Sequence, residues 1–297
     1  MPKINQKVLM SGADYFNDEF AINVFMDSKI PVDVAKAIKE HDSIKNAFEE
    51  AGITVFQVPA PPDLQDGVYT ANWGLTRSGK VLMSRLPNQR QPEEKYALEA
   101  VKGLGLEPLI LPENVARFSG QGDALPCGDI VFTQSPFRTT KEAHPYMKDM
   151  LGYSEIISLE TKPSRKLGGF GPVSYNKLTG LPNSPTYDID LAICILRWPD
   201  EGNKGLVAYC PKVFKSSSRR FLKEYDKVDK IEVSESEALD VFALNMVSTG
   251  EVAIINNHAP KFEAELHKHG LKTITLDLPE LRKGGGSIRC SSLTLDN

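Results

Sequence analysis

The sequence predicts a pseudo-fivefold α/β propeller, in which repeated units surround a central axis. Apolar runs and helical patterns recur in the order strand, strand, helix, strand, with a period of about 45 to 60 residues that is typical of internal repeats. A doubly wound sheet is the alternative, but its simple alternation of strand and helix lacks the second strand of each unit. With 297 residues the chain is long enough to form this closed fold as one domain, 1–297.

The composition is that of an ordinary globular protein, with 41% hydrophobic and 25% charged residues. The net charge of −4 argues against a nucleic-acid surface, so a small-molecule or protein partner is expected. No run approaches the roughly 18 apolar residues of a membrane span, and no membrane partner is expected. The 4 cysteines are widely spaced and no signal peptide is recognisable, which predicts free thiols in a reducing cytoplasm. A homo-oligomer is left open.

The first unit begins with an apolar strand at 8–10 and a polar turn at 11–14. A second apolar stretch follows at 20–26, and apolar residues then recur at helical spacing over 34–48. A short strand at 53–58 ends the unit.

The four later units repeat this order with small variations. Alternating or continuous apolar runs predict their strands, and a periodicity of 3.6 residues predicts their helices. In chain order we expect strands at 68–72 and 80–84, a helix at 92–104 and a strand at 107–111; strand segments at 116–118 and 129–133, a helix at 141–151 and a strand at 156–159; strands at 187–196 and 206–209, a helix at 217–225 and a strand at 230–233; and a helix at 235–242, strands at 246–247 and 252–255, a helix at 260–268 and a strand at 272–276.

Residues 161–186 separate the third and fourth units and show no periodicity. Glycines and prolines interrupt this basic stretch, which contains no acidic residue, so we expect a long loop. Long loops in compact domains often form lids, and a solvated surface insertion is the alternative.

The stretch GGGSIRC at 284–290 is the centre of the functional prediction. Its glycines permit turns and a close approach to a ligand, and so could present Cys290 at the start of a strand formed by 291–295. That position suits a nucleophile. The alternative is that Cys290 is a small buried hydrophobe, because free cysteine is among the most buried residue types.

Metal binding is not expected. Of the 5 histidines, only His267 and His269 lie close together, flanking a lysine in a helix expected to be exposed. Such a pair alone does not provide the ligand set of a structural or catalytic metal site.

Four ordered motifs lie at the N-terminus and in the second, third and last units. They are Asp14-Tyr15-Phe16 with Ala21-Ile22-Asn23, then Tyr69-Thr70-Ala71-Asn72, then Gly120-Gln121-Gly122-Asp123-Ala124-Leu125, and Gly284-Gly285-Gly286 leading to Cys290, with supporting matches at Ala143-His144-Pro145-Tyr146 and Ala243-Leu244-Asn245. Together they resemble the guanidino-group-modifying superfamily of arginine deiminases, dimethylarginine dimethylaminohydrolases, glycine amidinotransferase and arginine dihydrolases. The arginine dihydrolase type is the most similar. The resemblance covers nearly the whole chain and implies the α/β-propeller (pentein) fold.

The resemblance implies a guanidino substrate, a planar cation whose donors need acceptors at its edges. Asp190 matches the aspartate that contacts the guanidino group in the superfamily, and Asp123 matches the aspartate of its Gly-Asp segment. Asn23 and Asn72 match asparagines on inner-strand motifs that help to handle the substrate. Asparagine and aspartate beside turns also commonly cap the backbone, which is the alternative for all four residues.

Cys290 matches the nucleophile of the superfamily, whose thiolate attacks the guanidinium carbon, expels an amine and leaves an adduct for water to hydrolyse. A free thiol with a pKa of about 8.5 needs a cationic neighbour to ionise at neutral pH. Arg289 adjoins Cys290, but neighbouring residues of a strand point to opposite faces. The bound cationic substrate is therefore the expected activator.

Two positions depart from the superfamily pattern. Asp188 stands where the general acid–base histidine is expected, and Ser119 stands where a glutamate is usual. An ordinary aspartate is anionic at neutral pH, so it cannot supply the proton of an imidazolium, and its charge opposes thiolate formation nearby. Burial beside Asp190 could let Asp188 hold a proton, a residue of the basic loop could enter the site, or a distant histidine such as His144 could approach it.

The sequence thus predicts a cysteine-dependent hydrolase that acts on the guanidino group of arginine or a related compound, without metal or organic cofactor. Cys290 is the expected nucleophile, and Asp188 is the altered acid–base candidate. The alternative is a non-catalytic guanidino-binding or regulatory protein that lost the proton shuttle, because a fold does not determine a function. A related amidinotransferase is also left open.

Overall fold

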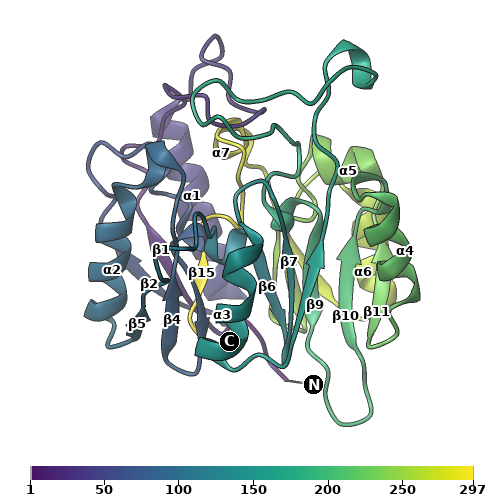
Figure 1. The fold of residues 1–297 in the computed structure, drawn as a ribbon. Helices are drawn as coiled ribbons and strands as arrows, with labels where there is room; N and C mark the ends of the chain where they lie inside the picture. Colours follow the sequence, from purple (N-terminus) through teal and green to yellow (C-terminus); the bar gives the residue numbers. More distant parts are fainter. Residues whose placement is uncertain (1, 297) are drawn as a thin grey trace.

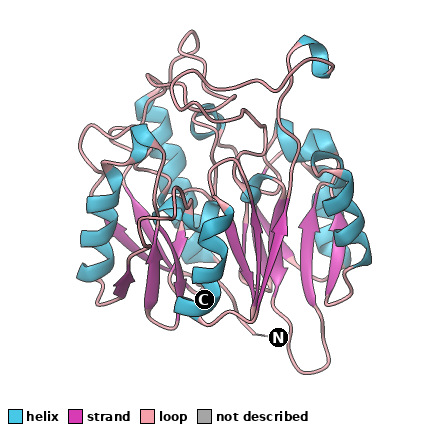
Figure 2. Ribbon diagram, in the orientation of Figure 1, coloured by secondary structure: helices cyan, strands magenta, loops and turns pink. Residues whose placement is uncertain are grey.

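The structure is a computed structural model that describes residues 2–296. Within these residues the strands form five separate three-stranded sheets, in a mixed α/β arrangement. Figure 1 shows the sheets side by side with both chain ends at one end of the molecule. Figure 2, coloured by secondary structure, shows that the longer helices lie on the periphery of the strands.

All five sheets share one connectivity. A central strand pairs antiparallel with one neighbour, here called the leading strand, and parallel with the other, called the trailing strand. In four sheets the three strands follow one another in sequence: β3 (Gly74–Arg77), β4 (Lys80–Met83) and β5 (Glu107–Leu109); β6 (Ala124–Cys127), β7 (Ile130–Gln134) and β8 (Glu155–Leu159); β9 (Ile193–Arg197), β10 (Gly205–Tyr209) and β11 (Val228–Glu232); β12 (Val247–Ser248), β13 (Val252–Asn256) and β14 (Lys272–Leu276).

The remaining sheet joins the two ends of the described chain. Its central strand β1 (Lys7–Ser11) pairs with the trailing strand β2 (Thr54–Val58) and with the leading strand β15 (Leu293–Thr294). Val8 lies opposite Thr294 in the antiparallel pair. The first sheet therefore repeats the common pattern only because residues near 294 return to the beginning of the chain.

A helix connects the central to the trailing strand in each sheet, because a parallel pair needs a crossover connection. These helices are α1 (Val34–Glu50), α2 (Glu93–Gly103), α3 (His144–Leu151), α4 (Ser216–Glu224) and α6 (Pro260–Lys268), and two further helices are α5 (Glu235–Asp240) and α7 (Pro279–Lys283). The central strands β7 and β10 are buried at every residue, as expected of strands flanked on both sides.

The short helix α7 precedes the glycine run and is fixed by α1. Both carboxylate oxygens of Glu40, on α1, accept hydrogen bonds from the backbone N–H groups of Glu280 and Leu281, at 2.9 and 2.8 Å. A carboxylate at a helix N-terminus satisfies donors that lack intrahelical partners. The entry to the glycine run is thereby anchored to the longest helix.

Two predicted strands are wrong. Residues 68–72 do not form a strand, because a 3-10 turn at Thr70–Trp73 precedes β3. At 116–118 only an isolated bridge from Phe118 to Arg85 is present, and the leading strand β6 of that sheet was not predicted. The apolar character of the first segment reflects the burial of a turn, which periodicity does not distinguish from a strand.

Residues 161–186 form a long loop, as predicted, with only isolated bridges and one short 3-10 turn at Leu167–Gly169. The loop lies at the end of the molecule opposite the chain ends (Figure 1). It contacts the loop that follows β1, since Asn176 Nδ2 donates to Ala21 O at 2.8 Å. The tip remains in solvent, with Phe170 97% exposed.

None of the helices within residues 2–296 has the length and apolar character needed to cross a membrane.

Candidate active site

A tight turn precedes the leading strand of each sheet and carries buried polar residues. In three sheets this turn contains a short 3-10 helix: η1 (Thr70–Trp73), η3 (Gly120–Gly122) and η6 (Ile189–Leu191). The η3 turn contacts both η1 and η6, so the turns meet in the interior. Five of these buried polar residues, one from each turn and each at most 2% exposed, are Asn72, Asp123, Asp190, Asn245 and Cys290.

Cys290 lies in a turn and not at the start of a strand, which corrects the sequence prediction, since β15 begins only at Leu293. The glycines make this turn possible. Gly285 has φ +89°, a conformation that side chains disfavour, and a Cβ added to Gly286 would lie 2.9 Å from the Cβ of Cys290. The carbonyl of Cys290 accepts a hydrogen bond from Ala71 N at 3.0 Å, which ties the turn to η1.

Two side chains from different sheets contact the sulfur of Cys290. Asn245 Nδ2 donates to Sγ at 3.1 Å, and the thiol donates to Asp190 Oδ2 at 3.1 Å. Asn245 Oδ1 also accepts from the backbone N of Ser287 and of Cys290, at 3.0 and 3.2 Å. Burial, followed by the charges of Asp190 and Asp188, raises the pKa of the Cys290 thiol well above its usual value. In the free protein the sulfur is therefore a thiol.

Asp190 and Asp123 are fully buried carboxyls with raised pKa values. Burial, then the charge of Asp188, raises the pKa of Asp190 to about 8, and the same causes raise the pKa of Asp123. Asp123 Oδ1 accepts from Ile189 N at 2.9 Å and from Gln134 Nε2 at 3.0 Å, so Asp123 holds the turn that carries Asp190. Among residues 2–296, Asp190 Oδ1 has no hydrogen-bond partner.

Asp188 and Ser119, the two residues that depart from the expected pattern, contact each other. Ser119 Oγ donates to Asp188 Oδ1 at 3.0 Å, and Asn72 Nδ2 donates to Asp188 Oδ2 at 2.9 Å. A Cβ added to Gly122 would lie 2.8 Å from Asp188 Oδ2, so glycine at this position gives the carboxylate its room. The two departures therefore form one interacting pair.

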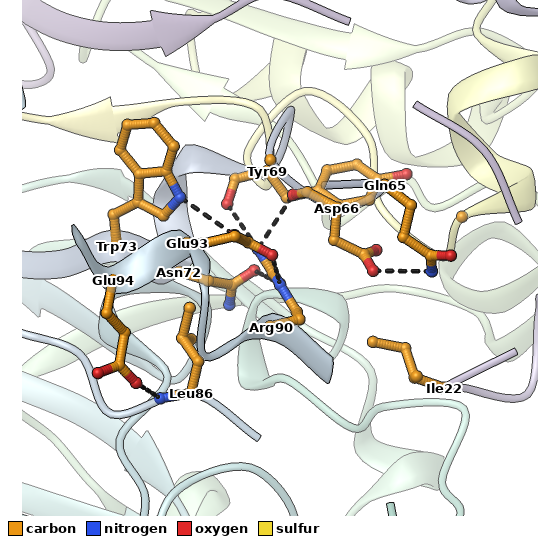
Figure 3. A network of polar contacts seen from close by, with 12 residues as sticks. Ile22, Gln65, Asp66, Tyr69, Asn72, Trp73, Leu86, Arg90, Glu93 and Glu94 are labelled. Carbon is orange, nitrogen blue, oxygen red and sulfur yellow. Dashed lines mark hydrogen bonds and ion pairs between the residues drawn. The ribbon is translucent and has the colours of Figure 1, made fainter. Parts of the chain in front are cut away.

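Arg90 fixes the orientation of Asn72, as Figure 3 shows. Its Nη1 donates to Asn72 Oδ1 at 2.7 Å, which leaves the Asn72 amide nitrogen directed at Asp188. Its Nε and Nη2 donate to the two carboxylate oxygens of Glu93 at 2.7 and 2.8 Å. The pair is almost completely buried, with side chains 3% and 1% exposed.

We expect Glu93→Gln to destabilise the protein by about 3 kcal/mol, because it leaves the guanidinium of Arg90 buried without its counter-charge. Urea unfolding measures the change. Glu265→Gln is the matched control: Glu265 pairs with Lys268 at the same i,i+3 spacing, but both side chains are exposed. The control should change the free energy of unfolding by less than about 0.5 kcal/mol. Equal effects of the two variants would contradict the prediction.

Asn23 lies in the loop after β1 and not on a strand, contrary to the prediction. Its Nδ2 donates to Gly284 O at 2.8 Å, and its Oδ1 accepts from Phe25 N at 2.9 Å. The neighbouring Tyr187 donates from its hydroxyl to Gly285 O at 2.7 Å, and the guanidinium of Arg138 lies 4.6 Å from the centre of the Tyr187 ring. These contacts hold the glycine run against the loops at this end of the molecule.

No histidine takes the place of the expected acid–base group. Within residues 2–296 no histidine makes a hydrogen bond to Cys290, Asp188 or Asp190, and the five lie on helices or in loops, at His41, His144, His258, His267 and His269. The basic residues of the long loop bind elsewhere: Lys162 Nζ donates to Lys212 O and Arg165 Nη1 donates to Gly171 O. No group of three potential metal ligands is present in the same described range.

The chain is similar in sequence and in fold to known proteins. A sequence profile of the eukaryotic N,N-dimethylarginine dimethylhydrolase family matches residues 12–156. The N(G),N(G)-dimethylarginine dimethylaminohydrolase of Mycobacterium tuberculosis is 28% identical over 291 residues, covering 98% of this chain and 86% of that protein. The bifunctional arginine dihydrolase/ornithine cyclodeaminase AgrE of Nostoc sp. is 28% identical over 294 residues, but this chain spans only 37% of its length.

A solved structure adds the three-dimensional comparison. The N-terminal domain of ArgZ, covalently bound to a reaction intermediate, is similar with a TM-score of 0.80 and 25% identity over 98% of both chains. The chain is similar to members of the guanidino-group-modifying superfamily. The resemblance inferred from the sequence motifs is confirmed, close to the arginine dihydrolase and dimethylarginine dimethylaminohydrolase types.

Three residues that the sequence analysis did not assign to the site contact it. Asn245 was noted only as part of a matching segment, yet it contacts both the sulfur and the backbone of Cys290. Arg90 orients Asn72, and Arg289 lines a small cavity together with Asp190. The spacing Arg90-x-x-Glu93 at the start of a predicted helix was a usable signal for a buried ion pair.

Proposed function

We propose that this protein is a cysteine-dependent hydrolase that acts on the guanidino group of arginine or a related compound. The observation that carries the proposal is the contact between Cys290 Sγ and Asp190 Oδ2 at 3.1 Å, deep in the meeting point of the turns. It places a nucleophile beside an acceptor for a planar cation. The named activities of the dihydrolase and dimethylaminohydrolase relatives, and the covalent intermediate on ArgZ, support the same chemistry.

Substrate binding is assigned to the carboxyls, with Asp190 and Asp123 as guanidinium acceptors and Asn23, Asn72 and Ser119 as positioning groups. Asp190 Oδ1 has no partner within residues 2–296 and can accept from the guanidinium. A bound cation favours the ionised forms of neighbouring acids, so it lowers the pKa of both Asp190 and Cys290. The bound cation thereby opposes the rise in pKa that burial causes. The substrate in this way favours the Cys290 thiolate, which then attacks the substrate.

The proposed covalent step conserves atoms and charge. The thiol of Cys290 gives its proton to a neighbouring carboxylate, and its sulfur forms a bond to the guanidinium carbon. The bond from that carbon to the leaving amine breaks, and the amine takes up the proton. Water then adds to the carbon as the carbon–sulfur bond breaks; one proton of the water restores the thiol and the other leaves through the carboxylate, so one water is consumed for each amine released.

Two carboxyls are candidates for moving this proton. Asp190, with a pKa of about 8, accepts the thiol hydrogen bond, and once a bound cation favours its ionised form it can take up the thiol proton. Asp188 occupies the position of the usual histidine and is the altered acid–base candidate. A replacement for the histidine is needed because loss of a general acid–base group commonly lowers the rate by about 10² to 10⁴. Both carboxyls are proposed for that role.

A second function is favoured by the Ser119–Asp188 pair. The hydrogen bond at 3.0 Å joins the two departures from the superfamily pattern, and no histidine among residues 2–296 replaces the proton shuttle by bonding to Cys290. A protein with this pair could bind a guanidino ligand without transforming it. The alternative is therefore a non-catalytic guanidino-binding or regulatory protein.

Mass spectrometry separates the two functions. We expect the wild-type protein, incubated with arginine and a panel of guanidino compounds, to release amine products and to show an adduct on Cys290. Binding with neither product nor adduct contradicts the enzyme proposal. In that case, activity gained only by Asp188→His combined with Ser119→Glu would support the non-catalytic function, whereas turnover by the wild-type protein excludes it.

We further propose that the five sheets are the blades of one closed propeller formed by residues 1–297. The shared connectivity of the sheets supports this arrangement, as does the pairing of β1 with β15, which brings the last strand into the first sheet.

A further inference from the structure

Arg289 is a buried cation that is bonded only to neutral groups. Its side chain is 6% exposed. Nη1 donates to Thr294 Oγ1 at 2.8 Å, and Nη2 donates to Gln121 Oε1 at 2.7 Å. Neither acceptor carries a charge, and no carboxylate within residues 2–296 forms a salt bridge with this guanidinium.

Gln121 is held rigidly, so it fixes the position of Arg289 without neutralising it. Its Nε2 donates to Thr76 Oγ1 at 3.1 Å and to Thr294 O at 2.9 Å. Its Oε1 accepts from Thr294 N at 2.8 Å as well as from Arg289. An amide with all these bonds has one orientation, which aims its oxygen at the guanidinium.

Burying a cation without a counter-charge is costly, so its charge must be compensated nearby. Burial lowers the pKa of Arg289 to about 10, and the charge of Asp190, followed by that of Cys290 when it is ionised, opposes that shift. Arg289 and Asp190 line one cavity of about 20 Å³ and are the only charged residues among its lining. Such a volume holds one water.

Two buried polar atoms of opposite character belong to this pair of residues. Arg289 Nε is a donor and Asp190 Oδ1 is an acceptor, and neither has a hydrogen-bond partner within residues 2–296. Both residues line the shared cavity, which has room for one water. Water-mediated contacts are nearly as favourable as direct hydrogen bonds.

We propose that Arg289 is a positioning residue that favours the carboxylate form of Asp190, acting across the water-sized cavity that the two residues line. The role rests on the proposed function, in which Asp190 must be ionised to receive a guanidinium. It differs from the expectation that the bound substrate alone supplies the positive charge. Arg289 adjoins the nucleophile in sequence but acts on the acceptor.

Several other charged or titratable groups surround Asp190 and Cys290. The charge of Asp188 raises the pKa of both Asp190 and Cys290. Asp123 accepts a hydrogen bond from Ile189 N in the turn that carries Asp190. A charge on Cys290 raises the pKa of the hydroxyls of Tyr69 and Tyr187. Arg90 acts on Asp188 and is paired with Glu93. Arg289 is therefore the cation that directly favours the Asp190 carboxylate.

The test is a carboxyl-¹³C NMR titration of aspartate-labelled protein, with the Asp190 resonance assigned by its loss in Asp190→Asn. In the wild-type protein this resonance should titrate near pH 8. Arg289→Met removes a charge that favours the carboxylate, so we expect the midpoint to rise by about one pH unit or more. Arg289→Lys keeps the charge and should stay within about 0.5 unit of the wild-type midpoint.

Arg85→Met is the matched control, because Arg85 also donates only to neutral acceptors, the carbonyls of Leu111, Pro112 and Val115. In the Arg85→Met protein the Asp190 resonance should have the same titration midpoint as in the wild type. If Arg289→Met does not fold, Gln121→Glu serves instead, since a carboxylate on Arg289 neutralises the guanidinium in place and should also raise the midpoint.

An Asp190 midpoint that stays at the wild-type value in the folded Arg289→Met protein, or in Gln121→Glu if the first variant does not fold, overturns the proposal. The titration needs no turnover. A protein that fails to hydrolyse any guanidino compound can still show the shift, so failure of the proposed function and failure of this inference are distinguished.

Discussion

Cys290→Ser is expected to lower turnover of guanidino compounds by about 10⁴-fold or more and to abolish the protein adduct. A serine hydroxyl is a far weaker nucleophile than a thiolate, and removal of a covalent nucleophile costs rate factors of this size in other hydrolases. Product release and intact-protein mass, measured together, check both parts of the expectation.

Cys127→Ser is the control for this variant. Cys127 is also a fully buried free cysteine, but its sulfur donates to Arg197 O, away from the site, and a serine there can keep that bond. It should retain wild-type turnover. Turnover retained by Cys290→Ser, or an adduct on another cysteine, would remove Cys290 from the role of nucleophile.

Asp190→Asn is expected to have two opposite effects. Affinity for arginine should fall about 10- to 100-fold or more, because a charge-assisted acceptor of the guanidinium is lost. The pKa of the Cys290 thiol should fall as well, because Asp190 is the main charged group that raises it, although burial keeps it above its usual value. Calorimetry measures the affinity, and thiolate absorbance against pH measures the ionisation.

Lower affinity for arginine together with a lower pKa of the Cys290 thiol distinguishes a direct role of Asp190 from general damage to the fold. Asp229→Asn makes the same chemical change at an exposed position on β11 and should alter neither property. An Asp190→Asn protein that binds arginine like the wild type would contradict the assignment of Asp190 as an acceptor. An Asp190→Asn protein in which the Cys290 thiol titrates at a higher pH than in the wild type would contradict the statement that the charge of Asp190 raises the pKa of this thiol.

Elements with a strong local pattern could be predicted from the sequence. The helix predicted over 34–48 corresponds to α1, because its apolar residues recur on one face and Asp33 accepts from Lys36 N as an N-cap. The strands predicted at 206–209 and 272–276 correspond to β10 and β14. Their continuous apolar or alternating runs do not depend on distant parts of the chain.

The leading strands were the least predictable elements. β12 and β15 have two residues each, and β6 contains a proline and a cysteine, so none shows a full period of alternation. Buried turns precede them, and these turns carry the functional side chains. Sequence patterns that depend on burial cannot tell such a turn from a strand, which explains the misplacement of 68–72 and of Cys290.

The motifs named the candidate site residues, but the contacts between these residues could not be predicted from the sequence. The structure joins Cys290 to Asp190 in one group and Asp188 to Asn72 and Ser119 in another. Asn245 and Arg289 required coordinates, because their importance comes from partners 45 and 168 positions away in the chain. A motif gives the residues of one segment, whereas these contacts join segments from different sheets.

The pairing of β1 with β15 has a consequence for how the protein matures. Val8 and Thr294 become neighbours only after the whole intervening chain has folded, and contacts of such long sequence separation form late. Asn245 and Asp190 can take their places during synthesis, before residue 290 leaves the ribosome. The thiol reaches them only when β15 pairs with β1, so the residues of the candidate site come together in one of the last steps of folding.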